Sequence, residues 1–197
     1  MKIYDISQEI LNCDIYPGDP KPNLVFQKET SKGDLYNLSE IHMGNHNGTH
    51  IDAPLHFINN GKTINDIDLN KCVGYCFVIN FEDIKDEQTT MNTLNKLQNI
   101  NNEAAKRLLV KPHCDISKEV AHLLAKHIDL IGSQTQSIGP ENAPMAVHLE
   151  LLRNDVVLLE GIRLHEVKEG MYFLSAAPLN IGKAEGAPCR AILIECN

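Results

Sequence analysis

Short apolar runs, separated by glycine, proline, asparagine and aspartate, dominate the sequence. Seven of these runs are rich in isoleucine, valine, leucine and aromatic residues, which is the pattern of β-strands. They cover residues 2–7, 37–43, 74–81, 129–131, 155–160, 171–176 and 190–196. The chain therefore predicts many short strands.

Helical periodicity is confined to fewer segments. Ser117 can cap a helix that places Val120, Leu123 and Leu124 on one face, and Pro144 can begin a second helix that ends near Asn154. A weaker pattern covers residues 90–98. Strands outnumber helices and the two do not alternate regularly. We therefore predict one α/β domain over residues 1–197, with a mostly β core and few helices.

Composition and charge narrow the class of protein. Leu, Ile, Val and Phe supply 56 of 197 residues, about 28%, which is enough for a folded core. The formal net charge of −8 argues against a nucleic-acid partner, because phosphate binding relies on Lys and Arg. No apolar run has the length of a membrane span, and the first nine residues lack the apolar core of a signal peptide. We expect a cytoplasmic protein with a small-molecule substrate and no membrane partner.

Six cysteines are scattered through the chain without a Cys-x-x-Cys pair. This spacing favours reduced thiols in a reducing compartment. A thiol enzyme that uses Cys72 or Cys76 is an alternative, but no histidine lies near either residue in the sequence.

Four of the nine histidines fall within fifteen residues, His42, His46, His50 and His56. Glycines and a proline argue against a helix there. In an extended chain, His46, His50, His56 and Asp52 share one side, and His50 and Asp52 would lie about 6.6 Å apart. His46 would lie about 13 Å from His50, so the chain must turn, and Asn47–Gly48 suits a turn.

Two interpretations of this cluster are possible. Exposed histidines beside a turn are common, but three imidazoles and a carboxylate on one side favour a metal site. The segment His46–His56 reads H-N-G-T-H-I-D-A-P-L-H. It resembles the H-x-G-T-H-x-D-A-P-x-H signature of the cyclase family of metal-dependent hydrolases, which includes bacterial kynurenine formamidases. Segments such as Pro17–Asp19 and Ala187–Ala191 extend the likeness over nearly the whole chain.

The resemblance implies a swivelling β/β/α-like fold and assigns roles to residues. His46, His50 and Asp52 would bind a first metal, and Asp52, His148 and Glu160 a second. Asp52 and Glu160 would bridge the two ions, and His56 would be the catalytic proton carrier. On sequence alone, the structural reading is favoured for both residues, with His148 as a helix histidine and Glu160 as a charge that ends a strand.

Cofactor, substrate and assembly follow from the same resemblance. The ions would be Zn²⁺, one or two per chain, with Mn²⁺ possible, and they would activate water toward a carbonyl. The expected substrate is an aryl formamide such as N-formyl-kynurenine, an intermediate of tryptophan catabolism, and the expected assembly is a homodimer or larger homo-oligomer. A hydrolase of a cyclic amide is the alternative, followed by a metal-binding domain without activity.

Three features of the sequence bear on how closely it follows the formamidases and on which substrate it accepts. Tyr16 stands where formamidases carry a large aromatic residue beside the aryl group. Gly139 stands in a segment where they carry an acidic residue. Residues 82–112 carry no recognisable motif.

Overall fold

A computed structural model describes residues 1–140 and 143–195. The strands form one nine-stranded mixed sheet in the order β1-β11-β9-β5-β6-β7-β8-β4-β10, and a separate two-stranded hairpin. The sheet strands are β1 (Ile3–Asp5), β4 (His50–Asp52), β5 (Val73–Asn80), β6 (Arg107–Lys111), β7 (Leu130–Ser133), β8 (Val157–Glu160), β9 (Gly170–Ser175), β10 (Gly186–Pro188) and β11 (Ile192–Glu195). The hairpin pairs β2 (Asn23–Lys28) with β3 (Leu38–His42).

The centre of the sheet is a run of parallel strands, β5, β6, β7 and β8, joined by helices. These helices are α2 (Glu87–Ile100), α3 (Lys118–Leu124) and α4 (Met145–Arg153), and the short α1 (Leu69–Cys72) precedes β5. The prediction that strands and helices do not alternate is therefore wrong for this part of the chain. It failed because β6 lies in the segment where no motif was found.

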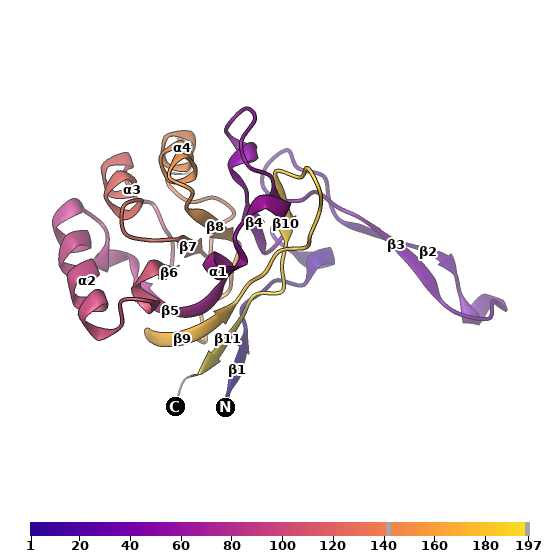
Figure 1. Ribbon diagram of the computed structural model, residues 1–197. Helices are drawn as coiled ribbons and strands as arrows, with labels where there is room; N and C mark the ends of the chain where they lie inside the picture. The colour runs from indigo at the N-terminus through magenta and orange to yellow at the C-terminus, as the bar shows by residue number, and fades with distance from the viewer. Residues whose placement is uncertain (141–142, 196–197) are drawn as a thin grey trace.

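Hydrophobic residues fill both faces of the sheet. Leu108 and Leu158 pack with the residues that α2, α3 and α4 turn inward, and their neighbours Leu109 and Leu159 pack in a second core on the other face. Figure 1 shows the three helices together on one side of the sheet, while β9, β11 and β1 curl away from them. Parallel strands covered on both faces read as continuous apolar runs, as β7 and β8 do.

The α/β class with a mostly β core is confirmed, and so are the two clear helices. Ser117 caps α3 by accepting a hydrogen bond from the Val120 amide, and Pro144 occupies the position directly before the first residue of α4 without a capping hydrogen bond. The weaker pattern at 90–98 is part of the longer α2. Strands β2, β6 and β10 were not predicted, and β4 lies outside the seven predicted strands, although the histidine segment that contains it was considered extended. The end of the predicted strand at 190–196 lies outside the described residues, as does Cys196.

Candidate metal centre

The five predicted metal ligands come from three regions that the sheet brings together. β4 pairs with β8 so that His50 lies directly opposite Glu160. Ile51 packs in the second core, so the alternating neighbours His50 and Asp52 face the side of the sheet that carries α4. His148 is a buried residue of α4 and completes the cluster from this helix.

The local path of the chain differs in part from the extended segment that the histidine spacing predicted. The strand β4 covers only His50–Asp52, and Pro54–His56 form a 3₁₀ turn. The chain does turn between His46 and His50, where Gly48 has a φ of +66°. A side chain at this position would be strained, and its Cβ would lie 3.1 Å from that of Cys13.

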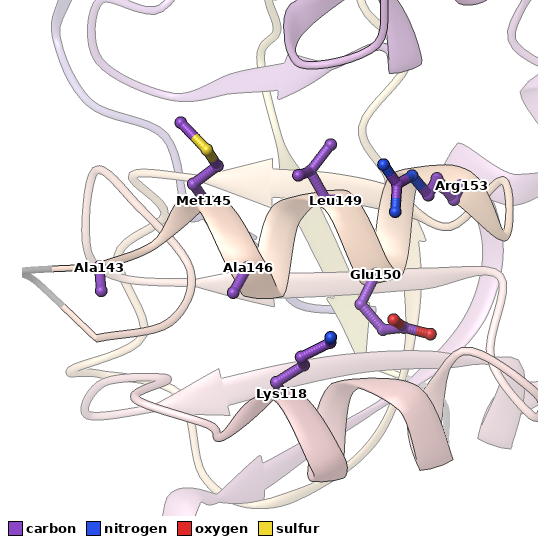
Figure 2. Close-up of a pocket in the computed structure, with 7 residues that line it drawn as sticks. All are labelled: Lys118, Ala143, Met145, Ala146, Leu149, Glu150 and Arg153. Atoms are coloured by element: carbon purple, nitrogen blue, oxygen red, sulfur yellow. The ribbon is translucent and has the colours of Figure 1, made fainter.

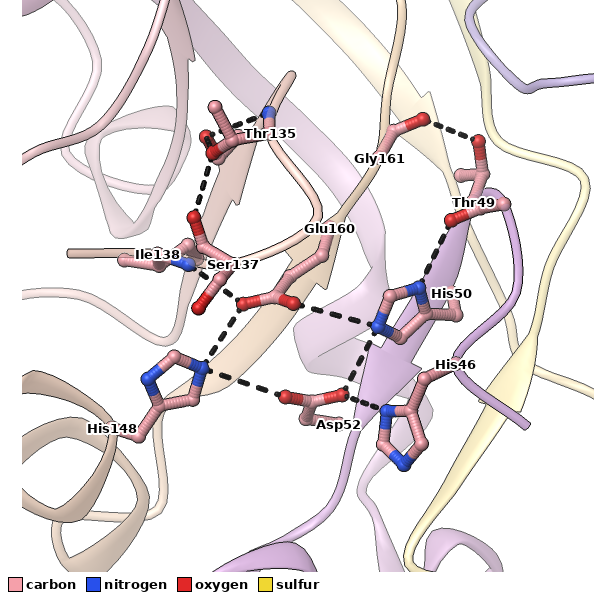
Figure 3. A network of polar contacts seen from close by, with 12 residues as sticks. His46, Thr49, His50, Asp52, Thr135, Ser137, Ile138, His148, Glu160 and Gly161 are labelled. Atoms are coloured by element: carbon pink, nitrogen blue, oxygen red, sulfur yellow. Dashed lines mark hydrogen bonds and ion pairs between the residues drawn. The ribbon is translucent and has the colours of Figure 1, made fainter. Parts of the chain in front are cut away.

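The side chains form two trios that share Asp52, as Figure 3 shows. In the first, Asp52 Oδ1 lies 2.9 Å from His46 Nδ1 and 3.4 Å from His50 Nε2. In the second, His148 Nε2 lies 3.1 Å from Glu160 Oε1 and 3.8 Å from Asp52 Oδ2. Glu160 also approaches the first trio, since its Oε2 lies 3.4 Å from His50 Nε2. The structure thus brings all five residues together.

Hydrogen bonds to the backbone show that a cation suits this cluster. His50 Nδ1 lies 3.0 Å from the Gly48 carbonyl, and His148 Nδ1 lies 3.0 Å from the Pro144 carbonyl. Each Nδ1 must donate there, so a neutral ring turns the lone pair of Nε2 toward carboxylate oxygens. Asp52 Oδ2 is buried and accepts no hydrogen bond from any described residue. Lone pairs that converge on a buried carboxylate fit a divalent cation that imidazole and carboxylate bind.

The pKa values of His50 and Asp52 in the metal-free protein also show that the cluster favours positive charge. Burial disfavours a charged His50, but the carboxylates of Asp52 and Glu160 outweigh this and raise its pKa to about 10. Burial would also raise the pKa of Asp52, yet hydrogen bonds from His46 and His50 lower it well below its ordinary value. The buried carboxylates therefore favour positive charge beside them, and protons on the histidines provide this charge when no metal cation is bound.

His56 belongs to neither trio. Its ring stacks on His46, with centroids 4.1 Å apart and planes tilted by 30°, and it contacts the Phe57 ring at 4.5 Å. The residue is exposed on its outer side. Burial of the ring and the neighbouring His46 and His148 lower its pKa, although Asp52 and Glu160 oppose the shift.

Glu185 is a site residue that the sequence did not suggest. Its Oε1 lies 3.3 Å from His46 Nε2, the ring nitrogen that faces away from Asp52, and its carboxylate accepts from the Asn45 amide. Carboxylates in this position orient metal-binding histidines. Glu185 lies beside His46 because the next residue, Gly186, begins β10, and β10 pairs with β4. Its only sequence signal was an acidic residue two positions before the segment Ala187–Ala191.

A cavity of about 250 Å³ opens over the cluster and is lined by His46, His50, His56, His148 and Glu160. Tyr16 lines the same cavity and is 40% exposed, so it lies at the rim. A groove of about 360 Å³ lies elsewhere, between α3 and the outer face of α4, where Met145 and Leu149 project outward (Figure 2). It contains none of the predicted site residues.

Cys72 and Cys76, the two thiols considered as nucleophiles, offer no competing centre. Burial raises the pKa of the Cys72 thiol to about 12, and Cys76 is also buried. A buried thiol of raised pKa is a poor nucleophile, which argues against the thiol enzyme.

Comparison with known proteins identifies the family. A sequence model of the Cyclase family, described as Putative cyclase, matches residues 4–140. The chain belongs to this family. A kynurenine formamidase of Erythrobacter litoralis is 32% identical, over 98% of this chain and 94% of the relative.

Solved structures agree with this family. A potential metal-dependent hydrolase with cyclase activity superposes with a TM-score of 0.77 at 28% identity, covering 98% of this chain and 96% of that one. An isatin hydrolase bound to thioisatinate gives 0.78 at 20% identity, covering 100% of this chain and 93% of that one, and shows the shared fold. The protein is a hydrolytic enzyme of the Cyclase family. No helix of the described residues is long and apolar enough to cross a bilayer.

Proposed function

We propose that this enzyme uses divalent metal to hydrolyse a non-peptide amide, and that its substrate is an aryl formamide such as N-formyl-kynurenine, in tryptophan catabolism. The observation that carries the proposal is the pair of trios that share Asp52, with His50 and His148 held so that Nε2 faces the carboxylates. The relatives named kynurenine formamidase support the substrate, because they match over nearly their full length.

His46, His50 and Asp52 would hold one ion, and Asp52, His148 and Glu160 a second, with Asp52 and Glu160 between them. We propose zinc, since imidazole and carboxylate donors suit it, with manganese as the alternative. When bound, such ions polarise a carbonyl and lower the pKa of water. The Ile138 amide donates to Glu160 Oε1 at 2.9 Å, which holds this carboxylate in place.

His56 would carry the proton to the leaving nitrogen. Its ring lies beside the cluster without belonging to it, and its exposed side can exchange protons with solvent. The lowered pKa keeps the ring neutral near pH 7, so that it can accept a proton before it delivers one. Tyr16, at the rim, would cover the aryl ring of the substrate.

A hydrolysis assay tests this proposal. Purified protein should hydrolyse N-formyl-kynurenine, lose activity after treatment with a chelator, and regain it with Zn²⁺ or Mn²⁺. Hydrolysis of a cyclic amide with no action on any aryl formamide would favour the alternative substrate class. A metal-loaded protein without activity on either class would leave only a metal-binding role.

We also propose that the enzyme is a homodimer. Figure 1 shows the β2–β3 hairpin extending away from the sheet. One face of it carries Leu24, Phe26 and Ile41, each more than a third exposed. An isolated two-stranded hairpin is marginal in water, so a second copy that covers this face would stabilise it. Light scattering should show a dimer, and Phe26→Lys should shift it toward monomer.

A cytoplasmic location completes the proposal. The described cysteines are all free thiols, as expected in a reducing compartment. Cell fractionation would test this location directly.

A further inference from the structure

A second hollow adjoins the cavity over the metal cluster. It measures about 510 Å³ and shares Tyr16, Gln136 and Ser137 with that cavity. We name it the side chamber. The cavity of about 250 Å³ is smaller than sites that enclose a drug-sized ligand, which span roughly 300–1,000 Å³. A substrate much larger than its reacting group therefore needs the side chamber as well.

The side chamber has one apolar and one polar wall. The consecutive residues Ile15, Tyr16 and Pro17 supply its apolar lining, and His113, Asp115 and Gln136 are among its polar lining residues. The His113 ring packs against Phe81 with centroids 4.5 Å apart, and its Nε2 lies 4.0 Å from the Asp115 carboxylate. Asp115 is half exposed, so it offers a negative charge at the mouth.

Gln136 lies on the partition between the two spaces, and its amide is unusual. Both Nε2 and Oε1 are enclosed, and neither bonds to any described residue. An enclosed amide without partners is unfavourable, because it has given up the hydrogen bonds that water would make with it. A turn of the side chain toward a polar group of a ligand would recover this cost, and such rotamer changes are common on binding.

The loop that carries Gln136 is held firmly. The Gly161 amide donates to the Thr135 carbonyl at 2.9 Å, and the hydroxyl of Thr135 donates to the Ser137 carbonyl. A Cβ at Gly161 would lie 2.3 Å from the backbone carbonyl oxygen of Gly48, so only glycine fits beside this loop. The backbone is thus fixed while the amide is left without partners.

Gly139 lines the side chamber without a side chain. Its φ is +97°, and a Cβ there would lie 2.9 Å from that of Val147. A side chain at this position is therefore excluded. Asp115 is a carboxylate that lines the same hollow.

We propose that the side chamber binds the part of the substrate that does not react, with Gln136 hydrogen-bonding to a carbonyl or amide of that part and Asp115 pairing with its ammonium group. This inference rests on the proposed function and specifies it. The substrate class is an aryl amide whose ring bears a polar side chain that ends in an α-amino acid group, with its ammonium toward Asp115. Tyr16 separates the two spaces at the ring.

Two substrates separate this role from a role in the reaction. Formanilide has the same aryl formamide as N-formyl-kynurenine but no side chain. Gln136→Met, which keeps the length and removes both hydrogen-bonding groups, should lower kcat/KM for N-formyl-kynurenine about tenfold, mainly through KM. Its kcat/KM for formanilide should stay within about twofold. Gln88→Met, the same change on the exposed face of α2, is the control and should alter neither.

Asp115→Asn is a second variant at a half-exposed position, where folding is not at risk. It should also lower kcat/KM for N-formyl-kynurenine, mainly through KM, and leave kcat/KM for formanilide nearly unchanged. Equal losses on both substrates in Gln136→Met, or no loss in either variant, would overturn the inference. Calorimetry with kynurenine, the product that keeps the side chain, gives a readout without turnover. Binding that both variants weaken would support the side chamber even if the enzyme hydrolyses no aryl formamide.

Discussion

Asp52→Asn is the sharpest test of the metal centre, because Asp52 is the residue that both trios contain. The substitution keeps the size of the side chain and removes one of the two negative charges that face His50 and His148. Each trio retains two of its three side chains. We therefore expect a wild-type content near two divalent ions per chain and a loss at both positions in the variant.

The expected effect on stability follows from mass action. An ion that binds only the folded state stabilises it by RT ln(1 + [L]/Kd), so a 100-fold weaker Kd removes about 2.7 kcal/mol when metal is in excess. For a domain of this size, 1 kcal/mol shifts Tm by roughly 2–4 °C. Asp52→Asn should therefore lower Tm by about 5–11 °C, with metal present, for each ion whose binding it weakens to this extent, and much less in chelator.

Elemental analysis after gel filtration and thermal unfolding with and without chelator measure the two effects. Asp34→Asn, the same change at the exposed tip of the hairpin, should keep both ions and the wild-type Tm. Two ions retained by Asp52→Asn would refute the shared position of this residue. One ion retained would restrict it to a single site.

Three further predictions concern other residues. His56→Asn should keep full metal content while kcat falls roughly 10²–10⁴-fold. The acid limb of the pH–rate profile, which is set by a pKa below about 6.5, should disappear in this variant. An unchanged profile would remove His56 from the reaction. Tyr16→Ala should raise KM for N-formyl-kynurenine and spare a small non-aromatic formamide, whereas equal losses would make Tyr16 a residue of the fold. Burial tends to raise the pKa of Asp155, but the ion pairs with Lys71 and Lys62 outweigh this and lower it. These ion pairs therefore stabilise the fold above about pH 3.9, the pKa of an unfolded Asp. The stabilisation is lost as the pH falls through the lower pKa that Asp155 has in the folded protein. Asp155→Asn tolerates the φ of +62° and should cost up to about 1 kcal/mol in urea unfolding at pH 7 and nothing near pH 2, and an equal cost at both values would contradict the ion pair.

The sequence predicted those parts of the site that a local pattern encodes. The segment from His46 to His56 carries its own motif, and the placement of His148 on a helix and Glu160 at a strand end is confirmed. Glu185 was missed because it reaches His46 only through the pairing of β10 with β4. Gly186–Pro188 has no strand pattern, so tertiary pairing alone makes it a strand.

The fold shows the same limit. Helices α3 and α4 have caps and periodicity and were predicted, whereas β6 is five residues long and buried almost throughout. A short apolar run of this kind fits a strand or a buried helix equally well. Without β6, the parallel order of the central sheet could not be inferred.

The short pairings of β4 bear on how the protein responds to chelation. β4 meets β8 and β10 over three residue pairs each, at one end of the sheet, whereas β5, β6 and β7 pair in its centre. A cation shared by β4, α4 and β8 would fasten this end as a cross-link between distant parts of the chain. Removing it should fray the edge first, so that backbone amides of β4 and β10 exchange with deuterium long before those of β6, and the central strands outlast the loss of activity.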